Sequence, residues 1–325
     1  MHRPTLCLVT PALADANNGN WQTAQRWARM LSGVYHVRIT SAWPDGHDAD
    51  VLLALHARRS APSVAAWASA HPERPVVLAL TGTDLYKDIH HDADAQHSLQ
   101  LANQIIVLQE QGLQALPEQL RHKAHIIYPS TTPLPTADKT HAHLRVVMVG
   151  HLRDEKWPQV LWQVAQILDV DEGIYIDHIG KALDPALAEE ALQVASQCKH
   201  YRWLGELPHA QTRRSIQRAH VLVHPSRLEG GAHVIMEAML SGTPVLASHV
   251  SGNVGMLGVN YPGYFEPGNA TQLVTLLRQC KQSQTQADGL LAHLTHACHA
   301  RAPLFQPERE QASLCALLSS ALHPL

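Results

Sequence analysis

No block of basic residues occurs in this sequence. Its 25 lysines and arginines are fewer than its 28 aspartates and glutamates, and the formal net charge is -3. Binding to the phosphate backbone of DNA or RNA requires clustered Lys and Arg side chains. We therefore expect no nucleic-acid partner.

Paired cysteines and long apolar runs are missing as well. The five cysteines are scattered without a CxxC pair, and an odd number in a long chain is typical of a reduced cytoplasmic protein. No apolar run reaches the ~18 residues of a membrane span. Residues 1–10 lead directly into a strand-like segment, not into a cleavable signal peptide. We expect a cytoplasmic protein with no stable membrane association, whose oligomeric state the sequence leaves open.

A metal site is not expected, although the chain contains 24 histidines. His293, His296, Cys298 and His299 cluster on an expected helix, where the three histidines share a face. A zinc site requires about three or four converging ligands with supporting neighbours, which a single helix face seldom supplies. We interpret the cluster as a solvated helix face and expect neither a metal nor another cofactor.

Short apolar runs separated by helix-length segments fill most of the chain. Runs of this kind are typical of strands buried on both faces, and their alternation with helices predicts βαβ units and parallel sheets. The runs are TLCLVT, YHVRIT, DVLLAL, PVVLAL, NQIIVL and HIIYP, then LRVVMVG, IYIDHIG, YRWLGEL, HVLVHP and PVLAS. The predicted fold class is α/β, with two doubly wound, Rossmann-like domains.

A segment rich in Pro and Thr, residues 129–143, separates the two groups of runs and is expected to be a linker. We predict domains at 1–135 and 142–302, followed by a helical segment at 303–325. Two such domains would face each other across a cleft. Ligands of open α/β sheets bind at the carboxyl ends of the strands, so the informative residues should follow strands directly.

Three loops of the first domain carry candidate residues for an anion or a sugar. In the NNGN loop before an expected helix near Trp21, a turn with an ordinary N-cap is an equally good interpretation. In LTGTDLYKD the alternative is a helix start capped by Asp84 or Thr83, and in LALHARRS it is a structural histidine. The candidates are Asn18, Gly19, Asn20, Thr23, His56, Arg58, Thr81, Gly82, Thr83 and Lys87.

In the second domain, VVMVGHLRDEKWP places Gly150 at a strand end, followed by His151, Arg153 and Lys156. A glycine turn lets the backbone approach a diphosphate, and cations neutralise its charge. Because acidic residues stand among the cations, a solvated mixed-charge turn is the alternative.

Two glutamates bracket the glycine-rich and apolar stretch SRLEGGAHVIMEAMLSGTP, residues 226–244. A carboxylate in such surroundings should have a specific partner, because an unpaired buried charge is costly. Carboxylates accept paired hydroxyl groups well, so Glu229 and Glu237 are candidates for binding a hexose and a ribose. The amides of the helix that begins after Gly231 would lie beneath a phosphate.

These motifs resemble those of the retaining glycosyltransferase family 4 (GT4), which has the GT-B fold. EGGAHVIMEAMLSGTPVLAS resembles its E-x7-E region, VGHLRDEK its G-R-L-x-x-E-K segment, and LTGTDL its H-G-T-D segment. The resemblance implies that Glu237 binds the nucleotide ribose, Glu229 the donor sugar and Lys156 the diphosphate. It also implies that the C-terminal helix crosses back to the first domain.

The resemblance extends to a full set of site residues. The residues implied in catalysis are Arg153, Lys156 and Glu229. Those implied in binding the nucleotide sugar are Gly150, His151, Arg153, Lys156, Leu204, Leu207, Glu229, Gly230, Gly231, Ala232, His233, Val234 and Glu237. The first domain would bind the acceptor.

Two departures from the family pattern bear on the acceptor. His151 stands where most members have Arg, which leaves Arg153 as the candidate for the missing charge. Thr81 stands where members often have a His implicated in acceptor activation. An acceptor that is already ionised needs no general base, whose contribution is ~10²–10⁴-fold.

The N-terminal run PALADANNGNWQTAQRWARML resembles a small branch of the family, the selenosugar synthases of selenoneine biosynthesis. This resemblance implies transfer of N-acetylglucosamine or glucose from a UDP-sugar to selenophosphate. The products would be a 1-seleno-sugar, UDP and phosphate. The alternatives are a GT4 enzyme with another small or carbohydrate acceptor, a UDP-sugar epimerase, and a non-catalytic binding module. The donor sugar and the product's anomeric configuration stay open.

Overall fold

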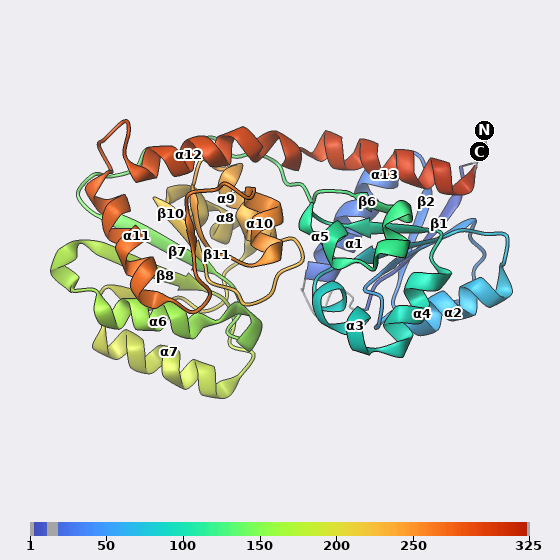
Figure 1. Cartoon of the computed structure of the whole chain (residues 1–325), viewed down its shortest axis with the longest axis horizontal. Helices are drawn as coiled ribbons and strands as arrows, with labels where there is room; N and C mark the ends of the chain where they lie inside the picture. Colours follow the sequence, from blue (N-terminus) through green and yellow to red (C-terminus); the bar gives the residue numbers. More distant parts are fainter. Residues whose placement is uncertain (1–2, 12–18, 324–325) are drawn as a thin grey trace. The chain divides into compact units, whose positions relative to one another are not determined.

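The computed structural model describes residues 3–11 and 19–323 (Figure 1). The chain forms two compact units, residues 1–130 together with 307–325, and residues 131–306. Each unit contains one six-stranded, wholly parallel sheet. Among the described residues, no helix is long and apolar enough to cross a bilayer.

The sheet of the first unit has the strand order β2-β1-β3-β4-β5-β6. In chain order its strands are β1 (Thr5–Val9), β2 (His36–Thr40), β3 (Val51–Leu55), β4 (Val76–Leu80), β5 (Gln104–Val107) and β6 (Ala124–Ile126). The two strands at the centre, β3 and β4, are continuous apolar runs of the sequence, and every residue of both is buried. A parallel strand covered on both faces can be apolar throughout, as these are.

Side-chain alternation along these strands divides the core of the first unit into two layers. Cys7, Leu52 and Leu78 point into one layer, while Leu6 and Leu53 point into the other. The helices are α1 (Gly19–Leu31), α2 (Ala61–Ala70), α3 (Ile89–His91), α4 (Ala93–Leu101), α5 (Gln111–Ala115) and α13 (Pro307–Leu322). α2 and α4 pack in the first layer, and α1 and α13 in the second.

Helix α13 is fastened to the first unit by a buried glutamate. Both carboxylate oxygens of Glu310 accept hydrogen bonds from Arg26, at 2.9–3.2 Å, and Oε1 also accepts one from Trp27 Nε1. Oε2 further accepts bonds from the backbone N–H and the hydroxyl of Ser130. The last helix therefore belongs to the unit that contains the first strand.

The sheet of the second unit has the order β12-β11-β10-β7-β8-β9. In chain order its strands are β7 (Leu144–Val149), β8 (Ile174–Ile179), β9 (Tyr201–Trp203), β10 (Val221–His224), β11 (Val245–Ser248) and β12 (Tyr264–Phe265). The helices are α6 (Pro158–Ile167), α7 (Pro185–Gln197), α8 (His209–Arg218), α9 (His233–Met239), α10 (Ser251–Leu257), α11 (Ala270–Gln282) and α12 (Leu290–Arg301).

Local sequence signals account for the starts of two helices of the second unit, α7 and α11. Asp184 accepts a hydrogen bond from the N–H of Ala186, and Pro185 occupies the first position of α7, where it needs no donor. Asn269 caps α11 in the same way by accepting from Gln272. Short helical turns complete the chain: η2 (Asp84–Asp88), η3 (Glu118–Lys123), η4 (Asp154–Lys156), η5 (Val170–Glu172) and η6 (Ala302–Phe305).

The predicted fold class, two doubly wound parallel α/β domains, is confirmed. All eleven apolar runs contain strands, and the two-residue strand β12 is the element that the runs did not predict. The assignment of acceptor binding to residues 1–135 and of the nucleotide sugar to residues 142–302 stays a prediction.

Candidate functional site

The loops that follow β7 and β10 bring two predicted site residues into contact in the second unit. Lys156 ends the short turn η4, and Glu229 lies in the loop between β10 and α9. The Lys156 ammonium donates to Glu229 Oε1, and the two side chains are only 16% and 10% exposed. The partner that the sequence required for the Glu229 carboxylate is therefore a lysine 73 positions earlier in the chain.

His224, the last residue of β10, is a second partner of the same carboxylate oxygen. Its Nε2 lies 3.0 Å from Glu229 Oε1 and 3.2 Å from Ser226 Oγ. Burial alone would raise the pKa of Glu229, but Lys156 and His224 hold that pKa well below its ordinary value. Burial lowers the pKa of His224, against the opposing effect of Glu229, so the ring is neutral at pH 7.

A glycine at the start of α10 allows the Glu229 loop to sit where it does. A Cβ on Gly252 would lie 1.9 Å from the carbonyl oxygen of Glu229. The neighbouring Asn253 Nδ2 donates to the carbonyl of Ser248 at 2.9 Å, and the Ser248 hydroxyl donates to the carbonyl of Ser226. Sequence analysis missed Gly252 and His224. The signal for Gly252 was a glycine two residues after His249-Val250. The signal for His224 was a polar residue at the end of an apolar run.

The acidic residues among the predicted diphosphate cations form ion pairs. Arg153 Nε lies 3.8 Å from Glu155 Oε2, and Arg153 is about half exposed. Arg227 Nη1 donates to Asp154 Oδ1 at 2.7 Å, and its guanidinium lies 3.9 Å above the ring of Trp157. The exposed side chains of this turn, Arg153, Asp154 and Glu155, therefore form a mixed-charge surface. Lys156 instead points inward to Glu229.

His151 is not a fixed positive charge. Its Nδ1 accepts a hydrogen bond from the N–H of Lys181 at 3.1 Å, and burial together with nearby Arg153 lowers the pKa of the ring. The preceding Gly150 is in close contact with Gly180, where a Cβ would lie 1.9 Å from the Gly150 carbonyl oxygen. Of the residues after β7, Arg153 and Lys156 remain as the permanent cations.

Glu237 lies in α9, is 7% exposed, and also has a basic partner. His209 Nε2 lies 2.8 Å from Glu237 Oε1, and this hydrogen bond raises the pKa of His209. One turn further along α8, the buried Arg213 donates to Thr131 Oγ1 at 2.6 Å and to the Thr132 carbonyl at 2.9 Å. Sequence analysis did not find His209, because it lies 28 positions from its partner.

The remaining predicted nucleotide-sugar residues lie in the loop after β9, in the loop before α9 and in the first turn of α9. Leu204 is exposed and Leu207 half-buried, and both follow β9. The N–H of Leu204 donates to the carbonyl of His178, and Trp203 Nε1 donates to that of Gly180. Between Glu229 and Glu237 lie the buried Gly230 and Ala232 and the half-buried Gly231, His233 and Val234.

In the first unit, the loops after β3 and β4 meet at a buried histidine. His56 has the left-handed φ of 72° and is 2% exposed. Its Nε2 lies 3.2 Å from Thr83 Oγ1, and its two ring nitrogens lie 3.9 Å from Asp84 and Asp88. Burial lowers the pKa of His56, against the opposing effect of Asp84, so a neutral imidazole faces the Thr83 hydroxyl.

Asp84 organises these two loops. Its buried carboxylate accepts hydrogen bonds from the N–H groups of Thr81, Gly82 and Ala57, at 2.8–2.9 Å. Thr83 makes no side-chain cap, and Asp84 begins the π-helical turn η2. The alternative interpretation, a helix start capped by Asp84 or Thr83, is therefore wrong: the Asp84 carboxylate binds amides that precede it and an amide of the neighbouring loop, not those of the first turn of η2.

The predicted cations of the first unit differ in their surroundings. Arg58 Nε donates to Asp88 Oδ2 at 2.9 Å, so its charge is already paired. Lys87 is exposed on η2.

The candidates near the start of α1 are only partly described. Asn18 lies outside the described residues. Gly19 and Asn20 begin α1, slightly earlier than the predicted start near Trp21, and Thr23 is buried in its first two turns. Their role in acceptor binding stays a prediction.

Comparison with known proteins identifies the segment that carries the Lys156–Glu229 pair. Residues 135–290 match the family profile described as "Glycosyl transferases group 1". This segment is similar to the group 1 glycosyl transferases. It contains the whole of the second-unit site described above, from Gly150 to Gly252.

Two curated relatives match part of the chain. Glycosyltransferase 1 domain-containing protein 1 of Xenopus tropicalis is 30% identical over 118 residues, which is 36% of this chain and 34% of the relative. Amylovoran biosynthesis glycosyltransferase AmsK of Erwinia amylovora is 26% identical over 171 residues, or 49% and 41% of the two chains. The matches thus span well under half of each relative.

Solved structures show that the chain has the GT-B fold over nearly its whole length. Anabaena HepE, in complex with UDP and glucose, has a TM-score of 0.74 at 15% identity and covers 98% of this chain and 100% of its own. Sucrose-phosphate synthase of Thermosynechococcus elongatus has a TM-score of 0.75 at 18% identity, with 98% and 99% covered.

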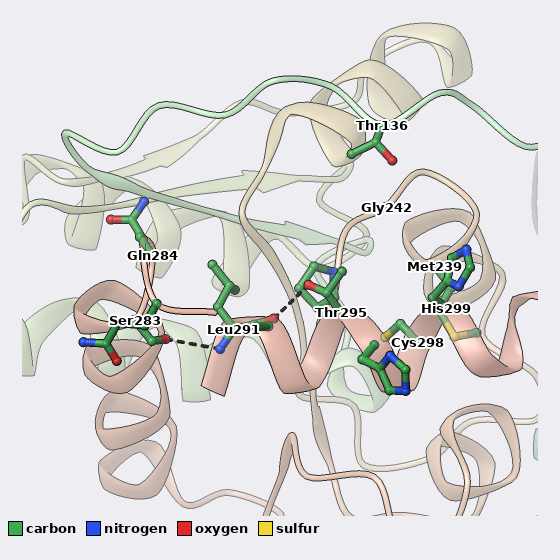
Figure 2. Close-up of a pocket in the computed structure, with 13 residues that line it drawn as sticks. Thr136, Met239, Gly242, Ser283, Gln284, Leu291, Thr295, Cys298 and His299 are labelled. Carbon is green, nitrogen blue, oxygen red and sulfur yellow. Dashed lines mark hydrogen bonds between the residues drawn. The ribbon is translucent and has the colours of Figure 1, made fainter. Parts of the chain in front are cut away.

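A pocket of about 520 Å³ lies elsewhere in the second unit, and none of the predicted site residues lines it (Figure 2). Thr295, Cys298 and His299 face it from α12, and Thr136 and Gly242 lie across from them. Within residues 3–11 and 19–323, no group of three or more His, Cys, Asp or Glu side chains converges as metal ligands would. The expectation that no metal is required stays a prediction.

Proposed function

We propose that the protein is a GT4-like glycosyltransferase, a selenosugar synthase, that transfers a hexose from a UDP-sugar to selenophosphate. The observation that carries the donor half of this proposal is the buried Lys156–Glu229 pair, with Glu237 in the helix that follows. UDP-sugar chemistry is supported by Anabaena HepE, whose structures contain UDP, glucose and UDP-glucose. The hexose would be N-acetylglucosamine or glucose.

Each donor-side residue then has one task. Glu237 accepts hydrogen bonds from the ribose hydroxyls, and Glu229 does the same for the hexose. Lys156 and Arg153 neutralise the diphosphate as the bond between the anomeric carbon and its oxygen breaks, which is the charge that develops in the transition state. Because these two cations supply that charge, we propose that no metal ion is needed.

The acceptor half of the proposal rests on the sequence departures and on the surroundings of Thr81. Selenophosphate carries its own negative charge, so its selenium atom attacks the anomeric carbon without a base, and UDP leaves. Water then cleaves the selenium–phosphorus bond, which releases phosphate and leaves a 1-seleno-sugar. The hydroxyl groups of Thr81 and Thr83, on either side of Gly82, would bind the phosphate oxygens. We place this reaction in the cytoplasm, in line with the unpaired cysteines.

A second candidate function is transfer to an ordinary hydroxyl acceptor. The observation that favours it is His56, whose Nε2 lies 3.2 Å from Thr83 Oγ1. Its pKa is lowered by burial, so this neutral imidazole is able to act as a general base for an alcohol.

Mass spectrometry of the reaction products separates the two functions. Purified protein is given UDP-N-acetylglucosamine or UDP-glucose, with and without enzymatically generated selenophosphate. We expect the selenium isotope pattern in a hexose-mass or hexosamine-mass product, together with UDP release. Release of UDP without incorporation of selenium would contradict the selenosugar assignment and favour the hydroxyl acceptor.

Removal of the Lys156 charge tests the donor half of the proposal in the same assay. Lys156→Met should lower the rate of UDP release by roughly 10²–10³-fold, the loss typical of one removed donor to a developing charge. Arg278→Met is the matched control, since Arg278 pairs with Glu172 on the surface at 2.6 Å, and its rate should be unchanged. An unchanged rate in Lys156→Met would contradict the donor assignment.

A further inference from the structure

One carboxylate oxygen in the second unit has two basic partners. Lys156 Nζ and His224 Nε2 both contact Glu229 Oε1, and the His224 side chain is 1% exposed. Ser226 Oγ lies 3.2 Å from the same His224 nitrogen. One cation, Lys156, is enough to balance the charge of Glu229. His224 therefore need not be protonated in the free protein.

The charges around His224 determine its protonation state. Burial lowers its pKa most strongly, Lys156 lowers it further, and Glu229 opposes both. From β11, Ser248 contributes only an uncharged hydroxyl near the His224 carbonyl. As long as Lys156 neutralises Glu229, a proton on His224 would add an unbalanced buried charge, which is costly.

Binding of a donor changes this balance. In the proposed function, on which this inference rests, Lys156 engages the diphosphate. The Glu229 carboxylate, only 10% exposed, would then lose its cation, and removal of one partner from a buried pair is strongly unfavourable. His224 is already within hydrogen-bond distance of that carboxylate and can replace the lost charge by binding a proton.

We propose that His224 takes up a proton when a UDP-sugar binds, so that a protonated His224 replaces Lys156 as the cation beside Glu229. His224 is thus a positioning residue. It keeps Glu229 ionised and oriented toward the hexose while Lys156 serves the diphosphate.

The sign of the effect follows from the change in surroundings. The pKa of His224 is low in the free protein and higher in the complex, so a proton is taken up at pH values between the two. Uptake approaches about one proton per donor bound in that window and falls toward zero above the raised pKa. The diphosphate of a UDP-sugar is a diester without a group that titrates near neutrality, so it contributes no proton of its own.

Isothermal titration calorimetry measures this uptake. UDP-N-acetylglucosamine or UDP-glucose is titrated into the protein in buffers of equal pH and different ionisation enthalpies, from about pH 6 to about pH 8. The dependence of the heat on the buffer gives the number of protons. We expect uptake in the wild type and its loss in His224→Gln, which keeps a neutral N–H close to the position of Nε2.

Two other histidines could take up the proton in place of His224. His209 pairs with Glu237, and His151 lies beside Arg153 and Lys156. Uptake should persist in His209→Gln and in His151→Asn. Loss of uptake in one of these variants, with uptake retained in His224→Gln, would overturn the assignment.

The outcomes distinguish this inference from the proposed function. If neither UDP-sugar binds the wild-type protein, the proposed function fails. If a UDP-sugar binds without proton uptake, the role of His224 fails and the donor assignment stands. Should His224→Gln not fold, NMR of isotope-labelled histidine in the wild type gives the same answer. One ring must change from neutral to protonated on donor binding, and the absence of that change would overturn the proposal.

Discussion

At the scale of single residues, the proposed donor site contains carboxylates whose partners come from distant parts of the chain. Glu229 pairs with Lys156 and His224, and Glu237 pairs with His209. A buried carboxylate is predictable from its apolar surroundings, because it must have a partner. The identity of the partner was not predictable, because Lys156 precedes Glu229 by 73 positions and the contact depends on the conformation of two loops.

The glycine behind the Glu229 loop provides a residue-scale prediction. In Gly252→Ala the added Cβ would lie 1.9 Å from the Glu229 carbonyl oxygen, so the loop must move. We expect a higher KM for the UDP-sugar. We also expect the free energy of unfolding to fall by ~1–3 kcal/mol, the destabilisation typical of an overpacked contact. Steady-state kinetics and urea denaturation measure the two effects.

Gly33→Ala is the control for that substitution. A Cβ on Gly33 has nothing within 4 Å, so this variant should keep the wild-type KM and be close to wild type in stability. An unchanged KM in Gly252→Ala would mean that the Glu229 loop is not positioned by α10.

At the scale of secondary-structure elements, periodicity predicted the strands well and the loops poorly. β3, β4, β10 and β11 are apolar and buried at nearly every position, so their sequences can be interpreted directly. β12 has only two residues and carries no such signal. The loop contacts of Asp84 were also missed, because its hydrogen bond to Ala57 joins two separate strand ends.

Helix α13 provides an element-scale prediction. Glu310 accepts hydrogen bonds from Arg26, Trp27 and Ser130 and is 2% exposed. Glu310→Ala removes one partner of a buried ion pair, which costs ~3–5 kcal/mol. We expect the free energy of unfolding, measured by urea denaturation, to fall by that amount.

The matched control lies in the same helix. Glu308 is exposed in the first turn of α13, and Glu308→Ala should change the stability by less than about 0.5 kcal/mol. Equal effects of the two substitutions would show that the Glu310 contacts do not stabilise the first unit.

At the scale of the whole molecule, the sequence predicted two Rossmann-like domains, and the GT-B fold agrees with that prediction. The fold was predictable because alternating apolar runs and helices restrict the topology strongly. Acceptor chemistry is less predictable, because it depends on how side chains from several loops, such as those of His56 and Thr83, come together in space.

The central claim is that the second unit binds UDP-sugars through Glu237 and Lys156. Calorimetric titration of UDP into the wild-type protein and Glu237→Gln tests it most directly. We predict binding by the wild type and a Kd about 10- to 100-fold higher in Glu237→Gln, as expected for lost hydrogen bonds to a charged group. His296→Gln, on the separate pocket, should bind UDP as the wild type does. No binding of UDP by the wild-type protein, or equal Kd values for wild type and Glu237→Gln, would contradict the account.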